Sequence, residues 1–101
     1  MIVRGTTPTI SFKYTVIQPS TIAVAYLTMF QNGERLLEKD LTTAEVGVDT
    51  ISWTLSQEET LAMTAGQALT IQCRYRLDDG SAYATKKATE DVLDVVKDGV
   101  I

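Results

Sequence analysis

The stretch from Gln67 to Lys87 constrains the fold more than any other part of the sequence. Apolar and polar side chains alternate along it, in the order Leu69, Thr70, Ile71, Gln72, Cys73, Arg74, Tyr75, Arg76 and Leu77. A period of two predicts a strand with one buried face and one face in water. Asp78, Asp79 and Gly80 follow, and these residue types tolerate the positive φ of a tight turn. We therefore predict a β-hairpin in which the chain from Ser81 onward runs back beside the first strand.

Three earlier segments also have the patterns of strands. One contains the alternating apolar residues Ile10, Phe12, Tyr14 and Val16, and another contains Ile51, Trp53 and Leu55. Trp53 is predicted to anchor the core, because Ile51 and Leu55 lie on the same face of the strand. A sugar-binding platform is the alternative interpretation of this Trp. The third segment, Ile22 to Phe30, is apolar on both faces, which is typical of a covered central strand or of an interface.

Local signals predict the turns and one helical turn. Asn32-Gly33 favours a two-residue type I′ hairpin turn. This turn would place Leu37 and Leu41 on the face of Val24, Thr28 and Phe30, with Leu36 on the other face beside Met29. Ser56 and Glu59 form a capping box, which predicts a single helical turn that carries Leu61 into the core. Residues 88–96 are compatible with a strand or a helical stripe, and their β-branched content favours the strand.

These elements predict one all-β domain over residues 1–101. Short strands separated by frequent turns indicate a sandwich or a small barrel. Six to seven strands around a central Trp favour an immunoglobulin-like antiparallel β-sandwich with one short helical turn. We expect an extended N-terminal arm at residues 1–8, where Pro8 lacks an N–H, and an apolar C-terminal tip at residues 97–101.

Composition argues against several classes of function. The net charge of −4 disfavours nucleic acid and anionic membranes as partners. The chain has no histidine, no nucleophile motif and one cysteine, which is Cys73. We therefore expect no enzyme activity, no cofactor and no metal. The acids at Asp78 and Asp79 resemble part of a calcium loop, but they lack its downstream carboxylate and are better explained as a surface turn.

One basic patch is a candidate interaction site. If Asp79-Gly80 is a two-residue turn, Arg76 pairs with Tyr83, Arg74 with Thr85 and Gln72 with Lys87. The outer face of this hairpin would then carry Arg74, Arg76, Tyr83 and Lys87. Such a patch is either a solvated face or a docking face, because interfaces favour Arg and Tyr. The same register points Lys86 inward, a conflict that a β-bulge near Ala84 would resolve.

The chain resembles a family of short proteins encoded among the tail and baseplate genes of phages and prophages of Gram-positive bacteria. The resemblance is carried by stretches that span the whole length: Met1 to Pro8 (MIVRGTTP), Gln31 to Gly33 (QNG), Leu37 to Leu41 (LEKDL), Leu55 to Leu61 (LSQEETL), Ile71-Gln72 with Asp79-Gly80, and Lys97 to Ile101 (KDGVI). None of these stretches is a chemical signature. The resemblance implies a tail-associated structural or assembly component of the virion, synthesised in the bacterial host cytoplasm, with no active site.

Two functions of different classes follow. In the first, the protein docks to other virion proteins or to copies of itself. In the second, it is a monomeric module that binds a ligand such as host-surface glycan, which requires exposed aromatic residues beside carboxylates or amides in one concavity. The apolar residues at the chain ends, which are Met1, Ile2, Val3, Val100 and Ile101, are candidate docking residues. The alternative is that they pack on their own domain.

Overall fold

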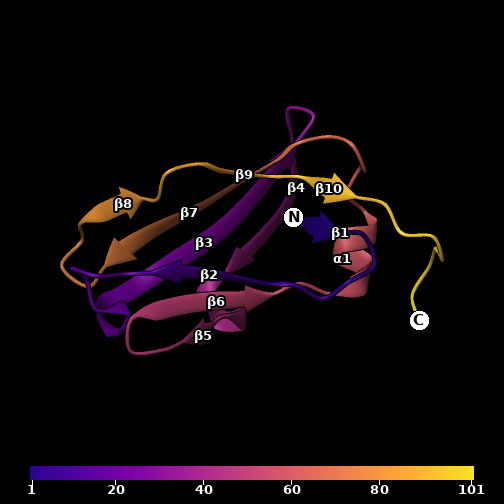
Figure 1. The fold of residues 1–101 in the computed structure, drawn as a ribbon. Helices are drawn as coiled ribbons and strands as arrows, with labels where there is room; N and C mark the ends of the chain where they lie inside the picture. The colour runs from indigo at the N-terminus through magenta and orange to yellow at the C-terminus, as the bar shows by residue number, and fades with distance from the viewer.

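Strands dominate the computed structural model, which describes residues 1–101 (Figure 1). The predicted all-β sandwich with one short helix is confirmed. The elements are β1 (Ile2–Val3), β2 (Thr9–Lys13), η1 (Pro19–Thr21), β3 (Ile22–Gln31), β4 (Glu34–Asp40), η2 (Leu41–Thr43), β5 (Glu45–Val46), β6 (Thr50–Thr54), α1 (Gln57–Leu61), β7 (Leu69–Leu77), β8 (Ala82–Ala84), β9 (Ala88–Glu90) and β10 (Val92–Leu93). Ten strands are present instead of six or seven, because β1 and β5 form outside the predicted strands and one predicted strand is split in two. The strand predicted over residues 88–96 forms as β9 and β10 only.

The strands form three sheets. The largest has the order β4-β3-β7-β8, and β9 also pairs with β7 beyond β8. A three-stranded sheet has the order β2-β6-β5 and packs against one face of the large sheet. The third sheet is the parallel pair β1 and β10, which the antiparallel prediction lacked. The domain is elongated, with principal extents of 46 × 27 × 19 Å.

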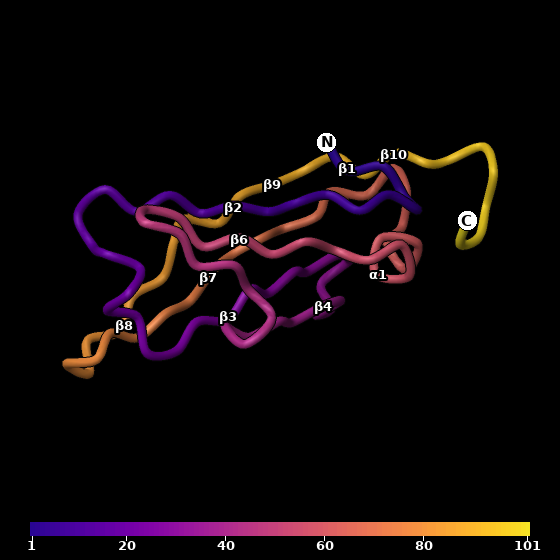
Figure 2. Tube along the Cα trace, turned by 90° about the horizontal axis from the view of Figure 1, so that it is seen from below, coloured from indigo at the N-terminus to yellow at the C-terminus, as the bar shows by residue number.

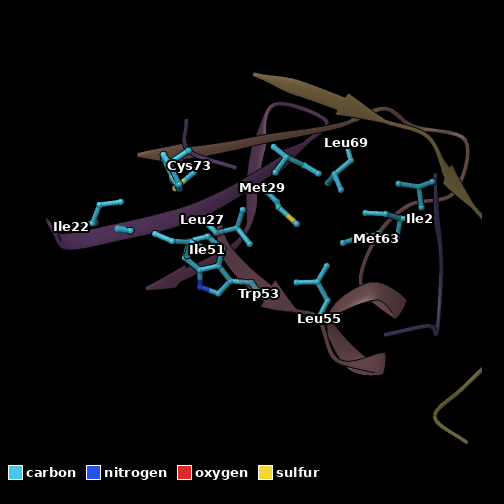
Figure 3. Packing of buried hydrophobic residues seen from close by; sticks show 14 residues of the cluster. Ile2, Ile22, Leu27, Met29, Ile51, Trp53, Leu55, Met63, Leu69 and Cys73 are labelled. Atoms are coloured by element: carbon cyan, nitrogen blue, oxygen red, sulfur yellow. The ribbon is translucent and has the colours of Figure 1, made fainter. Parts of the chain in front are cut away.

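The core fills the space between the two larger sheets (Figure 3). Trp53 is 1% exposed, and its Nε1 donates to the backbone carbonyl of Asp40 at 2.8 Å. Phe12 meets the Trp53 ring edge-on, with the ring centroids 6.0 Å apart. The burial of Trp53 confirms the prediction that it anchors the core and argues against a sugar-binding platform. Val16, in contrast, lies beyond the end of β2 and is exposed, so its predicted place on the buried face is wrong.

The hairpin of β3 and β4 has the predicted turn but a different register. Asn32 and Gly33 have φ values of 56° and 75°, as a type I′ turn requires. The pairing then shifts between Met29 and Phe30, so that Leu37 lies opposite Met29. The shift is a β-bulge at Leu36, which the sequence does not signal. The predicted outer-face positions of Leu37 and Leu41 are therefore wrong, because both side chains pack against the core. Leu36 also packs against the core, which is the face predicted for it, although it does not lie opposite Met29.

The short helix α1 begins as the capping box predicts. The hydroxyl of Ser56 accepts from the Glu59 N–H, and the Glu59 carboxylate accepts from the Ser56 N–H. Thr60 and Met63, however, are the buried residues of this region. Leu61 is only half-buried and lies beside Gly5, so its predicted place in the core is wrong.

The strands nearest the two ends of the chain, β1 and β10, lie side by side (Figure 2). In β1, Ile2 pairs with Val92 of β10, and its side chain is only 3% exposed. The Ile2 N–H donates to Asp91 O at 2.8 Å and the Arg4 N–H donates to Leu93 O at 2.9 Å. Residues 1–4 therefore pack on their own domain, which is the alternative given above for the apolar N-terminal residues. The C-terminal segment continues past β10 and α1.

Candidate interaction surface

The outer face of the five-stranded sheet, which points away from the core, is not covered by another sheet. Its central strand β3 presents Val24, Tyr26, Thr28 and Phe30 on this face, since Ala25, Leu27 and Met29 point into the core. The rings of Tyr26 and Phe30 are each 43% exposed. The sequence signal for this face was the strand that is apolar on both sides, and the structure places its outer side in solvent. The interface alternative thus stays open.

Charged residues flank Tyr26 of β3 on both sides. Tyr26 lies between Asp40 of β4 and Arg74 of β7 in the strand register. Thr28 lies between Glu38 and Gln72 in the next row. The hydroxyl of Thr28 donates to the Glu38 carboxylate at 3.2 Å, and Arg35 lies 3.5 Å from the same carboxylate. The β4 side of the face is thus acidic overall at Glu38 and Asp40, with Arg35 already paired.

The β7 side of the face is basic. Arg74 and Arg76 are exposed there, and neither forms an ion pair, which is also true of Lys87. A chain with a net charge of −4 therefore carries three unpaired cations in one region. Unpaired cations on one face favour an acidic partner through electrostatic complementarity.

A groove of about 570 Å³ crosses this outer face. Its floor contains short or polar side chains from β3 and β7, among them Thr28, Thr70 and Gln72. Phe30 of β3 also lines the groove, Arg35 and Glu38 lie on its β4 side, and Arg74 and Lys87 lie on the opposite side. Gln72 already donates through Nε2 to the carbonyl of Thr85 at 2.9 Å, which leaves its amide oxygen as an acceptor.

The structure brings together three of the four residues of the predicted basic patch. Arg74 and Lys87 line the groove, and Arg76 lies on the same face one row further along β7. Tyr83 does not join them, because it pairs with Tyr75 and stacks on that ring with centroids 5.7 Å apart. The predicted pairing of Arg76 with Tyr83 is therefore wrong, and Arg76 lies opposite Ala82.

A longer turn explains this difference. The Leu77 N–H donates to Ser81 O and the Gly80 N–H donates to Leu77 O, so three residues form the loop instead of two. Gly80 has the positive φ, 93°, that such a loop needs at its last position. The pairing on either side of residues 85–87 agrees with the bulge expected near Ala84. Arg74 lies opposite Ala84 and Ile71 lies opposite Ala88, which leaves one extra residue on the returning strand.

The candidate docking residues at the chain ends differ in exposure. Ile2 is buried in the domain's own core and Val3 is half-buried, so these two residues pack on their own domain. Met1 is exposed, and its ammonium forms an ion pair with Glu90. Val100 and Ile101 are exposed, the latter at 89%. Two hydrogen bonds join the backbone of Ile101 to the side-chain amide of Gln57. Of the five residues, Met1, Val100 and Ile101 thus present apolar side chains to solvent, whereas Ile2 and Val3 do not.

The thiol of Cys73 and the phenol of Tyr14 are the most deeply buried titratable groups with shifted pKa values. The Tyr14 hydroxyl lies 3.6 Å from Cys73 Sγ. Burial raises the pKa of the Cys73 thiol and raises the pKa of Tyr14 far above its ordinary value. A buried thiol of raised pKa is a poor nucleophile, so this pair is explained by packing. No group of three or more His, Cys, Asp or Glu side chains is arranged to hold a metal ion.

Comparison of the chain with protein-family models, curated proteins and solved structures gave no match. The structure contains no helix with the length and apolar character that a membrane span requires.

Proposed function

We propose that this protein is a non-enzymatic structural component of a phage virion, associated with the tail or baseplate, and that it acts by docking to neighbouring virion proteins or to itself. The virion context comes from the resemblance of the sequence. The docking role is supported by one feature of the outer sheet face, where the exposed ring of Tyr26 lies beside the unpaired Arg74 and the exposed ring of Phe30 lies further along the same strand. Aromatic residues and arginine are the types that protein interfaces favour over the rest of the surface.

The direct test is the composition of purified particles. The phage that carries the gene is propagated, and its particles are purified and searched for this chain by quantitative mass spectrometry. We expect the chain in a fixed ratio to the tail proteins. A double variant, R74E with R76E, should reduce incorporation, whereas K13E on the opposite sheet should not. A chain that accumulates in the host but is missing from wild-type particles would refute the virion role.

A second function, binding of a glycan as a monomer, is favoured by the groove. The groove places the exposed ring of Phe30 beside the Gln72 amide and the Glu38 carboxylate, which is the combination that saccharide sites use. Its volume of about 570 Å³ is within the range of small-ligand sites. Calorimetric titration with host cell-wall saccharides tests this function, with F30A and Q72A as the variants that should abolish binding.

A further inference from the structure

The charges on the outer sheet face are arranged on opposite sides of β3. Glu38 and Asp40 lie on the β4 side, and Arg74, Arg76 and Lys87 lie on the β7 side. Between them runs the stripe of β3 side chains with its two exposed rings. A surface that is acidic on one side of an apolar stripe and basic on the other can match a copy of itself, provided that symmetry places unlike charges together.

Symmetry allows this match for one direction of the two-fold axis. If the axis lies between two copies and runs along β3, the rotation exchanges the two sides of the stripe and keeps each row in place. The row Asp40, Tyr26, Arg74 of one copy then faces the same row of the other copy in the reverse order. An in-plane axis perpendicular to the strands would instead place β4 on β4 and β7 on β7, where like charges repel.

We propose that two copies of this chain pair face to face through their outer sheet faces, with β3 against β3 and Asp40 of each copy opposite Arg74 of the other. The inference rests on the proposed docking role and names a second copy as the partner. Tyr26 and Phe30 lie on the axis, where each ring meets its own counterpart, and aromatic pairs contribute beyond the area that they bury. Face-to-face sheets pack about 10 Å apart, which leaves room for these rings to interdigitate.

The size of the face agrees with such a pairing. Strands lie about 4.8 Å apart and rise about 3.3 Å per residue, so four strand positions by eight residues cover roughly 500 Å² in projection. The relief of the side chains adds to the accessible area, and a standard interface buries about 800 Å² per partner. Pairing also gives the unpaired Arg74 an acidic partner, and it covers the groove. A dimer and a groove open to a saccharide are therefore mutually exclusive.

The test uses the full chain and two charge reversals, R74E and D40R. Each variant alone places two like-charged pairs in the dimer, whereas a mixture of the two restores both attractive pairs. Sedimentation equilibrium up to the millimolar range should give the wild-type chain twice its mass of 11.1 kDa. Each single variant should dissociate with a Kd raised about tenfold or more, because like charges are juxtaposed. The equimolar mixture should recover the dimer, and added salt should weaken the wild-type dimer.

Two controls keep the result interpretable. K13E makes the same change of charge on the three-stranded sheet and should leave the dimer intact. D40R also removes the side chain that accepts from the Thr42 N–H, so thermal unfolding of each variant is recorded. Y26D, which places two acids on the axis, disrupts the pairing without touching that cap. A wild-type chain that stays monomeric, or a dimer that R74E and Y26D leave unchanged, would overturn the proposal.

Binding of an anionic saccharide to a monomeric chain would likewise overturn the dimer and assign the face to a ligand. The result is independent of the particle experiment. A monomer that still enters virions retains the proposed function and loses this pairing. A dimer that never enters virions retains this pairing and contradicts the proposed function.

Discussion

The Nε of Arg4 donates to the backbone carbonyl of Met63 at 3.0 Å, a contact between residues 59 positions apart in the sequence. The same guanidinium donates through Nη2 to Leu61 O at 2.9 Å, and its Nη1 lies 2.6 Å from the Asp94 carboxylate. The carbonyls at the end of a helix have no partner within it. Arg4 therefore caps α1 from outside and ties the first strand, the helix and the C-terminal segment together.

Replacing Arg4 by alanine should destabilise the domain by about 2–3 kcal/mol, because charged hydrogen bonds to partly buried carbonyls are lost. Arg4→Lys should recover only part of this loss, since an ammonium cannot reproduce the planar geometry of the guanidinium. Urea unfolding measures both values. Lys13→Ala is the matched control, because Lys13 is exposed and lies 4.0 Å from its partner Asp49. Equal effects of Arg4→Ala and Lys13→Ala would show that the Arg4 contacts are not formed in solution.

Trp53→Ala should cost about 3–5 kcal/mol, the range for removal of a large buried aromatic residue. The change also removes the indole N–H that donates to the carbonyl of Asp40, which then keeps only the Thr43 hydroxyl as a side-chain donor. For a domain of this size such a loss approaches the whole free energy of unfolding. The measurement is the denaturant midpoint, with Val48→Ala as a control at an exposed site. A midpoint that Trp53→Ala leaves unchanged would place the indole on the surface.

Gly33→Ala should destabilise the domain by about 1 kcal/mol or more through strain at positive φ. Nothing lies within 4 Å of the Cβ that the substitution adds, so steric contact contributes nothing to the expected loss. Gly80→Ala should behave in the same way, because its φ is 93° and its surroundings are equally open. A chemically synthesised chain with D-alanine at position 33 should retain wild-type stability, and unfolding midpoints decide between the two enantiomers.

The carboxylate of Glu59 should make stability depend on pH. Burial raises the pKa of Glu59, but the Ser56 N–H and the Lys39 ammonium, 3.0 Å away, outweigh it and hold the pKa below its ordinary value of 4.5. A folded-state pKa that is lowered stabilises the fold above the unfolded value, and this contribution is lost as the pH falls through the folded value.

Glu59→Gln keeps an acceptor for the capping box but removes the charge. We therefore expect a loss of about 0.5–1 kcal/mol at pH 7, which should vanish at a pH well below 4.5. Thermal unfolding of both proteins across this range measures the difference. If the two curves stay parallel down to low pH, the Glu59 charge does not contribute to folding.

The two ends of the chain should respond differently to truncation. Deletion of Met1 to Val3 removes the buried side chain of Ile2 and both residues of β1, so we expect a loss of about 2–4 kcal/mol. Deletion of Gly99 to Ile101 removes exposed side chains and should change stability by less than about 0.5 kcal/mol. Chemical unfolding of the two truncated chains tests this contrast. A large effect of the C-terminal deletion would mean that the tip packs more firmly than its exposure indicates.

Local signals in the sequence predicted the elements whose causes are local. Alternation identified the strands around Trp53 and Ile71, and residue chemistry identified the Asn32-Gly33 turn and the capping box at Ser56. Register was less predictable. A loop of three residues instead of two after Leu77 moves every facing residue by one position, and this change removed Tyr83 from the basic patch.

Contacts between residues far apart in the sequence could not be predicted from local patterns. The parallel pairing of Ile2 with Val92 joins segments 90 residues apart, and no local pattern in Met1 to Pro8 signals it. The candidate surface was predictable in part, because the strand from Ile22 to Phe30 is apolar on both faces. The separation of charge on its two sides depends on which strands flank β3, and that order is a property of the tertiary fold.

The pairing of β1 with β10 determines how the domain would respond to tension on its two ends. The strands are parallel, the N-terminus precedes β1, and the C-terminus follows β10. A pull on the two ends therefore slides one strand along the other, so that the Ile2–Asp91 and Arg4–Leu93 hydrogen bonds are loaded together instead of opening one after the other. Shear of this kind raises the force at which strands separate, and forced unfolding is governed by the rate of that separation. When the chain is stretched from its two ends, the β1–β10 pair is therefore the first part of the domain to bear the load, and it resists separation.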